Sequence, residues 1–339
     1  MKAGKLKIIY IFLFVLLFLA ECSQPQSSRT EFVLGAAVCT ITLFEQGKDS
    51  IYRDIFSRLR EIENLMSVNI PLSDVSRINA AAGIEPVQVH DDVFKVIERA
   101  LYYAQLSGGA FDPSVGPLVS LWGIGSNNAR APSHAEIEKV LPLINWRDIE
   151  LDPQTKSVYL KNKGMSLDLG AIAKGYAADE AAVIIRKENI ARAIIDLGGD
   201  ILILGKKKDR SLWKVGVQDP DGSRGSYIGI LQITEQTVVT SGVYERFFEE
   251  NGIRYHHIFL PSDGFPVSNG LLSVTIITHN STDADALSTA VFVLGYEKGL
   301  SLIESLPETE AVFIFEDRSI RKTAGADFTL NDDSYFLVN

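Results

Sequence analysis

The sequence predicts an α+β protein with two interlocked lobes, in which mixed, largely antiparallel sheets are flanked by helices. Apolar residues recur three or four positions apart over 51–66 and 93–104, which indicates amphipathic helices in the first third of the chain. Beyond residue 211 the pattern is mainly β, with short apolar or alternating runs between turn signals. Such segregated helices and antiparallel strands are typical of the α+β class. No repeat, linker or clean boundary divides residues 31–339, so we expect one domain there.

The remaining elements are predicted from periodicity and from end signals. Ser133 stands three residues before Glu136, which gives a short helix at 133–141 a capping motif. Residues 113–132 are rich in Gly, Pro and Asn and predict a long loop of the kind that often has a function. Further helices are expected at 172–188, 283–294 and 297–305, strands at 32–44, 148–151, 157–161, 165–169, 193–196, 201–204, 212–217, 226–234, 237–241, 254–260, 271–278 and 311–316, irregular chain at 67–90, and a weakly patterned tail at 318–339.

Composition and charge narrow the classes of partner. The chain has 339 residues, of which 46% are hydrophobic, enough to bury one large core. Its formal net charge is −10, and its one dense basic run, 206–210, directly follows the apolar strand at 201–204. A solvated turn explains that run better than a binding stripe does, so we expect no nucleic-acid partner.

The N-terminus predicts export. Residues 1–21 form a signal peptide, with three lysines before the apolar run 8–20, which is too short to cross a bilayer comfortably. The run ends in a sequence resembling a bacterial lipobox, although Glu21 stands where a small residue is usual. We expect acylation at Cys22, a polar tether over 22–30, and a location on the periplasmic face of the inner membrane. An ordinary signal peptide with a coincidental cysteine is the alternative.

The segment 283–292 is the first candidate site. Asp285 and Thr289 are four residues apart, so they share one face of the predicted helix. A carboxylate and a hydroxyl are hard oxygen ligands that suit Mg²⁺. The alternative is structural, because acids in a first turn complement the helix dipole and Ser281 or Thr282 can cap the helix.

A second candidate lies at 166–176, where a short strand containing Asp168 leads through Gly170 into a helix. A strand, a glycine turn and a helix N-terminus form an anion site, to which Lys174 adds a positive charge. The segment is not a Walker loop, because the Gly-x-x-x-x-Gly-Lys-Ser/Thr pattern is absent. A buried strand acid beside a surface lysine is the structural alternative.

Taken together, these segments resemble the ApbE family of FAD-dependent FMN transferases. The resemblance spans roughly residues 31–316, and its motifs keep the family's order. The matching segments are 109–113 (Gly-Ala-Phe-Asp-Pro), 166–176, 196–200 (Asp-Leu-Gly-Gly-Asp), 240–244 with His257, 260–266 and 285–289.

The resemblance implies a Mg²⁺-dependent FAD:protein FMN transferase. Such an enzyme attaches FMN through a phosphoester to Thr or Ser of a partner, such as a flavin-bearing subunit of an Rnf- or Nqr-type membrane redox pump, and releases AMP. The metal would be held by Asp285, Thr289 and the carbonyl of Ala171. Ala110, Phe111 and Asp112 would line the flavin, Asp168 and Lys174 would bind polar groups of FAD, and Phe259 would flank the adenosine half. His257 would contact phosphate or adenine, unless it is only a structural hydrogen-bonding residue.

Two departures from the family pattern leave other functions open. Ser288 stands where relatives often have another acid, which predicts a weaker or wetter metal site. Asn69 stands where a Tyr commonly covers the flavin, and a smaller amide predicts easier access for water. An FAD pyrophosphatase giving FMN and AMP is therefore the alternative activity. A non-catalytic flavin-binding lipoprotein is a third, against which the metal pair argues.

Overall fold

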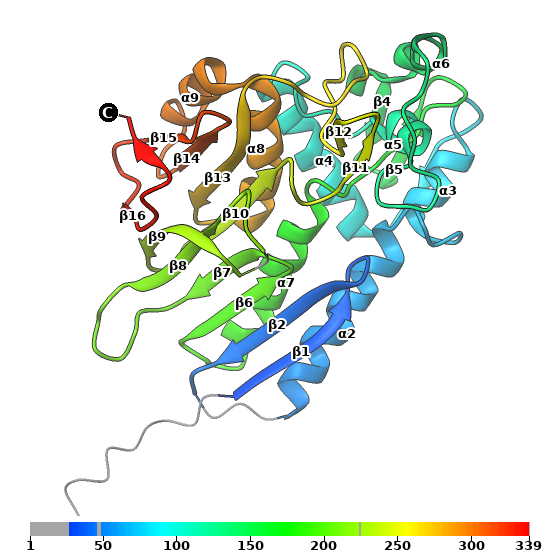
Figure 1. The fold of residues 1–339 in the computed structure, drawn as a ribbon. Helices are drawn as coiled ribbons and strands as arrows, with labels where there is room; N and C mark the ends of the chain where they lie inside the picture. Colours follow the sequence, from blue (N-terminus) through cyan, green and yellow to red (C-terminus); the bar gives the residue numbers. More distant parts are fainter. Residues whose placement is uncertain (1–26, 46–48, 224, 339) are drawn as a thin grey trace, which may run out of the picture.

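A nine-stranded sheet forms the centre of the protein in the computed structural model, which describes residues 27–45, 49–223 and 225–338 (Figure 1). Its strands, in spatial order, are β1 (Ser27–Val33), β2 (Ala37–Leu43), β6 (Ala193–Leu197), β7 (Asp200–Leu204), β10 (Thr237–Gly242), β13 (Leu271–Thr278), β14 (Glu310–Phe315), β15 (Ser319–Lys322) and β17 (Phe336–Leu337). Neighbouring strands are antiparallel, apart from the parallel pair β15 and β17.

Each face of this sheet has its own apolar cover. Helices α2 (Asp49–Met66), α4 (Asp91–Leu106), α7 (Ala173–Lys187), α8 (Ser281–Leu294) and α9 (Tyr296–Glu304) contribute to one cluster, and a smaller sheet of β8 (Trp213–Gln218), β9 (Tyr227–Ile233) and β16 (Phe328–Leu330) covers the other face (Figure 1). Successive strand residues alternate between the two clusters. Val238 and Ile277 join the cluster under the smaller sheet, whereas Val239 and Ile276 join the helical cluster. Burial on both faces explains why apolar residues occur at successive positions in these central strands.

The smaller lobe is built around a third sheet and a third apolar cluster. The sheet contains β3 (Val87–Gln88), β5 (Ser157–Leu160) and β4 (Ile149–Asp152), beside α3 (Asp74–Ala80) and two short 3₁₀ turns, Leu141–Leu143 and Trp146–Asp148. The cluster joins α5 (Gly116–Trp122) and α6 (His134–Val140) to the hairpin of β11 (Phe247–Glu250) and β12 (Ile253–His256). At its centre, the fully buried Trp122 donates its indole N–H to the carbonyl of Gly264 at 2.9 Å.

The predicted α+β class, with largely antiparallel sheets flanked by helices, is confirmed. The predicted stripe over 51–66 is the buried face of α2, and the predicted capping box at Ser133 is present at the start of α6. In the described residues no helix has the length and apolar character needed to cross a membrane.

Several boundaries differ from the prediction. Residues 318–339 are not a tail, because β15, β16 and β17 join the two sheets and bury Ile320, Phe328 and Tyr335. The predicted strand at 32–44 is two strands joined by a tight turn, and its first half begins at Ser27, inside the predicted tether. The irregular stretches 67–90 and 113–132 contain α3 and α5. The signal peptide at 1–21 and Cys22 lie outside the described residues.

Candidate active site

One cleft of about 890 Å³ gathers almost all of the predicted site residues. It lies where the ends of β2, β7 and β10 meet the starts of α7 and α8, and the smaller lobe closes its other side. The predicted residues in its lining are Ala110, Phe111, Asp112, Asp168, Ala171, Lys174, His257, Phe259, Asp285 and Thr289. A cavity of this size is within the range of small-molecule and cofactor sites.

Asn69 is the predicted site residue that the cleft lining does not include. It is exposed in the turn that follows α2, where its backbone N–H donates to the hydroxyl of Ser67 at 3.2 Å. In the described structure its amide is not part of the cleft wall.

Asp285 is fixed at the junction of α7 and α8. Its carboxylate accepts the backbone N–H of Gly175 at 2.9 Å, and a Cβ on Gly175 would lie 2.1 Å from the carbonyl oxygen of Ser281. A glycine is therefore needed at position 175 for α7 to approach the start of α8. Asp179, one turn later in α7, accepts the backbone N–H groups of Ser281 at 3.0 Å and of Thr282 at 2.9 Å, so it caps α8 from the neighbouring helix.

The carboxylate of Asp285 is buried without a full counter-charge. Burial raises its pKa, and the positive charge of Lys174 and the N–H of Gly175 oppose that rise. A buried carboxylate that is held by backbone N–H groups and lacks a full counter-charge favours either a proton or a bound cation.

Hydroxyl groups complete this corner of the cleft. The half-buried Thr289 hydroxyl lies 3.3 Å from that of Ser241, which also lies 2.8 Å from the hydroxyl of Ser288. Ser288 is fully buried and donates to the carbonyl of Asp285 at 2.9 Å. Ser288 therefore bonds to its own helix and does not supply the acid found at this position in the family pattern.

The segment 166–170 forms the next part of the cleft wall. Within the described residues, its only β-pairing is an isolated bridge between Ser166 and Val115. Asp168 accepts the N–H of Gly170 at 2.7 Å, which turns the chain toward α7. Lys174, at the start of α7, forms an ion pair with the buried Asp200. The lysine charge is therefore partly neutralised before any ligand binds.

Asp112 is part of the cleft wall and also holds the flanking loop. Its carboxylate accepts the N–H of Ser114 at 2.8 Å, the hydroxyl of Ser114 at 2.6 Å and the N–H of Trp146 at 3.1 Å. Burial raises its pKa, while these three donors oppose the rise. Because these donors occupy both oxygens, Asp112 mainly positions the adjoining Ala110 and Phe111.

The two adjacent histidines have different roles. His256 is buried, and its Nε2 lies 2.9 Å from the carbonyl oxygen of Val267, so it joins two chain segments. His257 is half-buried in the cleft wall, and its Nδ1 lies 3.1 Å from the carbonyl oxygen of Arg246. Burial, with the nearby charge of Arg246, lowers the pKa of His257 to about 3. The ring is therefore neutral at physiological pH, with the proton on Nδ1 and an acceptor lone pair on Nε2.

The charge balance of the cleft fits a divalent cation. Six lining residues are acids and two are bases: Asp112, Asp168, Asp196, Asp200, Glu245 and Asp285 against Lys174 and Arg246. Within the described residues no group of three or more His, Cys, Asp or Glu side chains has metal-binding spacing. One buried carboxylate, a hydroxyl and a carbonyl would instead supply hard oxygen ligands, a set that suits Mg²⁺ shared with substrate phosphates.

Parts of the lining were not predicted from the sequence. The turn Leu34–Ala36, in which three successive residues have positive φ angles, contributes main chain to the wall. The β8–β9 sheet contributes the half-exposed Tyr227, and the chain after β10 contributes Arg246. Gly35 could have predicted the turn at 34–36 from the sequence, because glycine adopts positive φ angles readily. The two side chains follow no periodic pattern and come from segments far apart in the sequence.

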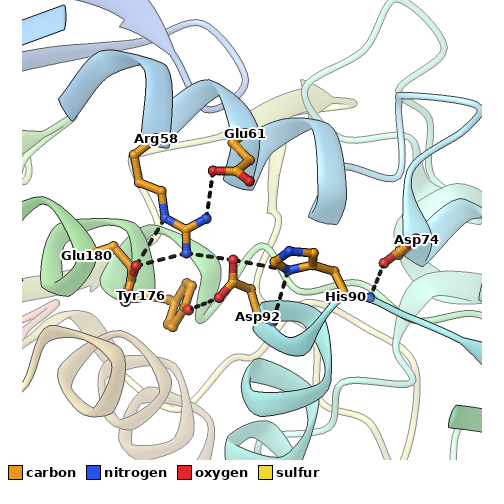
Figure 2. Close-up of polar contacts among 7 residues, drawn as sticks. All are labelled: Arg58, Glu61, Asp74, His90, Asp92, Tyr176 and Glu180. Carbon is orange, nitrogen blue, oxygen red and sulfur yellow. Dashed lines mark hydrogen bonds and ion pairs between the residues drawn. The ribbon is translucent and has the colours of Figure 1, made fainter. Parts of the chain in front are cut away.

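Behind the cleft, a second polar cluster joins three helices. Figure 2 shows Arg58 of α2 between Asp92 of α4, at 2.6 Å, and Glu180 of α7, at 2.8 Å. Tyr176 of α7 donates its hydroxyl to Asp92 at 2.6 Å, and Glu61 lies 2.8 Å from Arg58. We call these five residues the α2–α4–α7 network.

The fold and the cleft define a class of protein: an α+β protein with a cofactor-sized cleft lined by both apolar and charged residues. Within that class the chain belongs to the ApbE family, whose model matches residues 36–313. It is 39% identical over 315 residues to a FAD:protein FMN transferase of Treponema pallidum, covering 88% of this chain and 87% of the relative. A FAD:protein FMN transferase of Klebsiella pneumoniae is 41% identical over 266 residues, with coverage of 78% and 82%.

Solved structures agree with this assignment. The ApbE protein of Thermotoga maritima superposes with a TM-score of 0.81 at 34% identity, covering 88% of this chain and 97% of that protein. The flavin transferase ApbE of Vibrio cholerae superposes with a TM-score of 0.77 at 25% identity, covering 92% and 98%.

Proposed function

We propose that this protein is a Mg²⁺-dependent FAD:protein FMN transferase. The main observation is that Asp285, Thr289, Lys174 and His257, from separate parts of the chain, line one cleft large enough for a cofactor. Curated relatives that match most of the chain are named for this activity. The excess of acids over bases in the lining supports the metal requirement, since a diphosphate substrate adds further negative charge.

The reaction would exchange one phosphoanhydride bond for a phosphoester. The hydroxyl oxygen of the acceptor Thr or Ser bonds to the FMN-side phosphorus, and the bond from that phosphorus to the bridging oxygen breaks. AMP leaves with the bridging oxygen and its electron pair. His257 offers Nε2 as the acceptor for the hydroxyl proton, because Nδ1 is held by the carbonyl of Arg246.

Residues of this chain would also bind the metal and the flavin. Asp285, Thr289 and the carbonyl of Ala171 would hold Mg²⁺, which neutralises phosphate charge when it is bound. Ala110 and Phe111 would contact the isoalloxazine ring, and Phe259 the adenosine half. Lys174 and Asp168 would fix polar groups of FAD near the start of α7. Fixing both reactants in one cleft supplies positioning, a main source of rate enhancement in phosphoryl transfer.

The test is a paired product assay. The protein is incubated with FAD, Mg²⁺ and a flavin-accepting subunit of a membrane redox pump. AMP is measured by chromatography and the acceptor by intact mass spectrometry. We expect equal amounts of AMP and of acceptor carrying one FMN, and neither product when EDTA replaces Mg²⁺. An acceptor whose mass does not change, at any Mg²⁺ concentration, would contradict the proposal.

Omitting the acceptor tests hydrolysis, the alternative activity. Water would take the place of the protein hydroxyl, giving free FMN and AMP from the same cleft. Asn69 is predicted to favour this reaction by leaving the flavin less covered, and Asn69→Tyr would then slow acceptor-free AMP release while FAD still binds. The exposed place of Asn69 outside the described lining favours equal rates in the two proteins. The rate comparison separates the two expectations.

We also propose that a lipid on Cys22 holds the protein at the periplasmic face of the inner membrane. Support comes from the apolar run 8–20 and the lipobox-like sequence that follows. Anchoring would keep the cleft close to membrane-embedded acceptors. Mass spectrometry of the native protein decides this point: a mature N-terminus at a diacylated Cys22 is expected, and an unmodified N-terminus elsewhere would rule it out.

A further inference from the structure

The two basic residues of the cleft lining differ in whether an acid of the protein forms an ion pair with them. Lys174 is paired with Asp200 inside the protein. Arg246, the other basic residue of the lining, lies in the connection between β10 and β11 and is exposed. Within the described part of the chain, no side chain forms an ion pair or a hydrogen bond with its guanidinium. A cation without a protein partner, in a cleft lined by six acids, is available for an anionic ligand.

The main chain of Arg246 is tied to the proposed proton acceptor. Its carbonyl oxygen accepts the backbone N–H of His257 at 3.1 Å and lies 3.1 Å from Nδ1 of the same residue. These two contacts set the position and the tautomer of the imidazole. They involve backbone atoms of residue 246, so a change of its side chain leaves them in place.

The side chain of Arg246 extends toward the smaller lobe. Its Cδ lies 3.5 Å from the position that a Cβ on Gly125 would occupy. Gly125 has a φ angle of +87°, which disfavours any other residue there, and follows α5 in the smaller lobe. Arg246 therefore lies beside the proposed proton acceptor and next to the smaller lobe.

We propose that the guanidinium of Arg246 binds a phosphate group of FAD, while its main-chain carbonyl holds His257 in the tautomer that accepts a proton. This inference rests on the proposed function. Arginine suits the role because its planar fork can donate two parallel hydrogen bonds to a phosphate and remains charged at any physiological pH. One residue would thereby place the phosphate and the proton acceptor at a fixed separation.

The test measures binding without turnover, in EDTA, by flavin and tryptophan fluorescence. Arg246→Met is compared with the wild type for FAD, FMN, AMP and riboflavin. The matched control is Arg254→Met, because Arg254 pairs with Glu249 on the β11–β12 hairpin, outside the cleft lining, and its loss changes the net charge equally. Arg246→Lys keeps the charge but not the fork.

Loss of a charge-assisted phosphate contact is expected to raise the Kd for FAD by about 10- to 100-fold in Arg246→Met. Arg246→Lys should fall between that variant and the wild type. Riboflavin, which has no phosphate, should bind equally to all the proteins, and Arg254→Met should bind FAD like the wild type. Whichever of FMN and AMP loses affinity identifies the phosphate bound.

Two results would overturn the assignment: unchanged FAD affinity in Arg246→Met, or an equal loss for riboflavin and FAD, which would indicate a structural role. The proposed function fails in a different way. A wild type that binds FAD but attaches no FMN to an acceptor would reject the transferase activity and leave the binding role of Arg246 standing.

Discussion

Two faces of helix α7 differ in how far the charged groups beside them are compensated by opposite charges. Lys174 faces the cleft, whereas Tyr176 and Glu180, about 200° and 240° around the helix from Lys174, face the α2–α4–α7 network (Figure 2). In the network, Arg58 forms ion pairs with three acids, and Tyr176 donates a hydrogen bond to one of them. In the cleft, six acids face two bases.

The pKa shifts of the two regions run in opposite directions. Burial would raise the pKa of Asp92 in the network, but Tyr176 and Arg58 overcome it and the pKa is lowered. Burial raises the pKa of Asp285 in the cleft, and its neighbours do not overcome it. A charge satisfied within the protein indicates a structural role. A buried charge left partly unsatisfied indicates a site that is completed by a ligand.

Replacing Asp285 by Ala should have the largest effect. We expect FAD turnover to fall by at least about 1,000-fold, because loss of the carboxylate removes the metal and with it several kcal/mol of transition-state stabilisation. FAD binding by ring stacking should remain. AMP release at saturating Mg²⁺ is the measurement. Wild-type turnover by Asp285→Ala would refute the assignment of this residue to the metal.

Arg58→Met should break the network without touching the cleft. It leaves Asp92 and Glu180 partly buried without their cation, which costs about 3 kcal/mol of unfolding free energy. Chemical denaturation measures this cost. Activity per folded molecule should stay close to wild type at a temperature where the variant is folded, and a large loss there would show that the network acts in catalysis.

Gly175→Ala tests the junction between the two faces. The added methyl would meet the Ser281 carbonyl at 2.1 Å, so α7 and α8 must separate. Such overpacking costs about 1–3 kcal/mol. It should also weaken the hydrogen bond to Asp285, and therefore Mg²⁺ affinity. Isothermal titration of Mg²⁺ in the presence of FAD would show it. Unchanged affinity would mean that Gly175 is needed for packing alone.

Tyr176→Phe should have the smallest effect, about 1 kcal/mol at neutral pH from one lost buried hydrogen bond. Its pH dependence follows from Asp92. Because the folded pKa of Asp92 lies below the unfolded value, its stabilisation is complete above that value and is lost as the pH falls through the folded pKa. The difference in stability between Tyr176→Phe and wild type should therefore shrink in acid. A constant difference from neutral to acid pH would contradict the role of Tyr176 in lowering this pKa.

The sequence predicts what is local and misses what depends on distant pairing. The stripe of α2 and the cap at Ser133 need only neighbouring residues. The strands after residue 318 are only two to four residues long, and one of them, β16, pairs with the distant β9. The sequence predicts a loop where α5 forms, because its seven residues lie in a Gly- and Pro-rich stretch.

The same division holds for the site. A sequence contains no distances between residues that are far apart along the chain. The resemblance to the family is what predicts that Asp285, Lys174 and His257 share one site. The network escaped prediction because Arg58 and Glu180 are 122 residues apart. Arg246 escaped because one exposed arginine in a connection has no periodic signal. The predicted role of Asn69 followed from its alignment position, and the structure places the residue in an exposed turn.

The most direct test compares the melting temperatures of wild type and Asp285→Asn, first in EDTA and then with FAD and Mg²⁺. The raised folded pKa means that ionisation of Asp285 destabilises the ligand-free protein as the pH rises above the unfolded value, and the neutral amide removes that cost. We therefore expect Asp285→Asn to melt above the wild type in EDTA at neutral pH. With FAD and Mg²⁺ the order should reverse, because the wild type gains stabilisation from both ligands and the variant from FAD alone. An Asp285→Asn variant that melts below the wild type in EDTA would contradict the account, since Asp285 would then be a structural acid like Asp92.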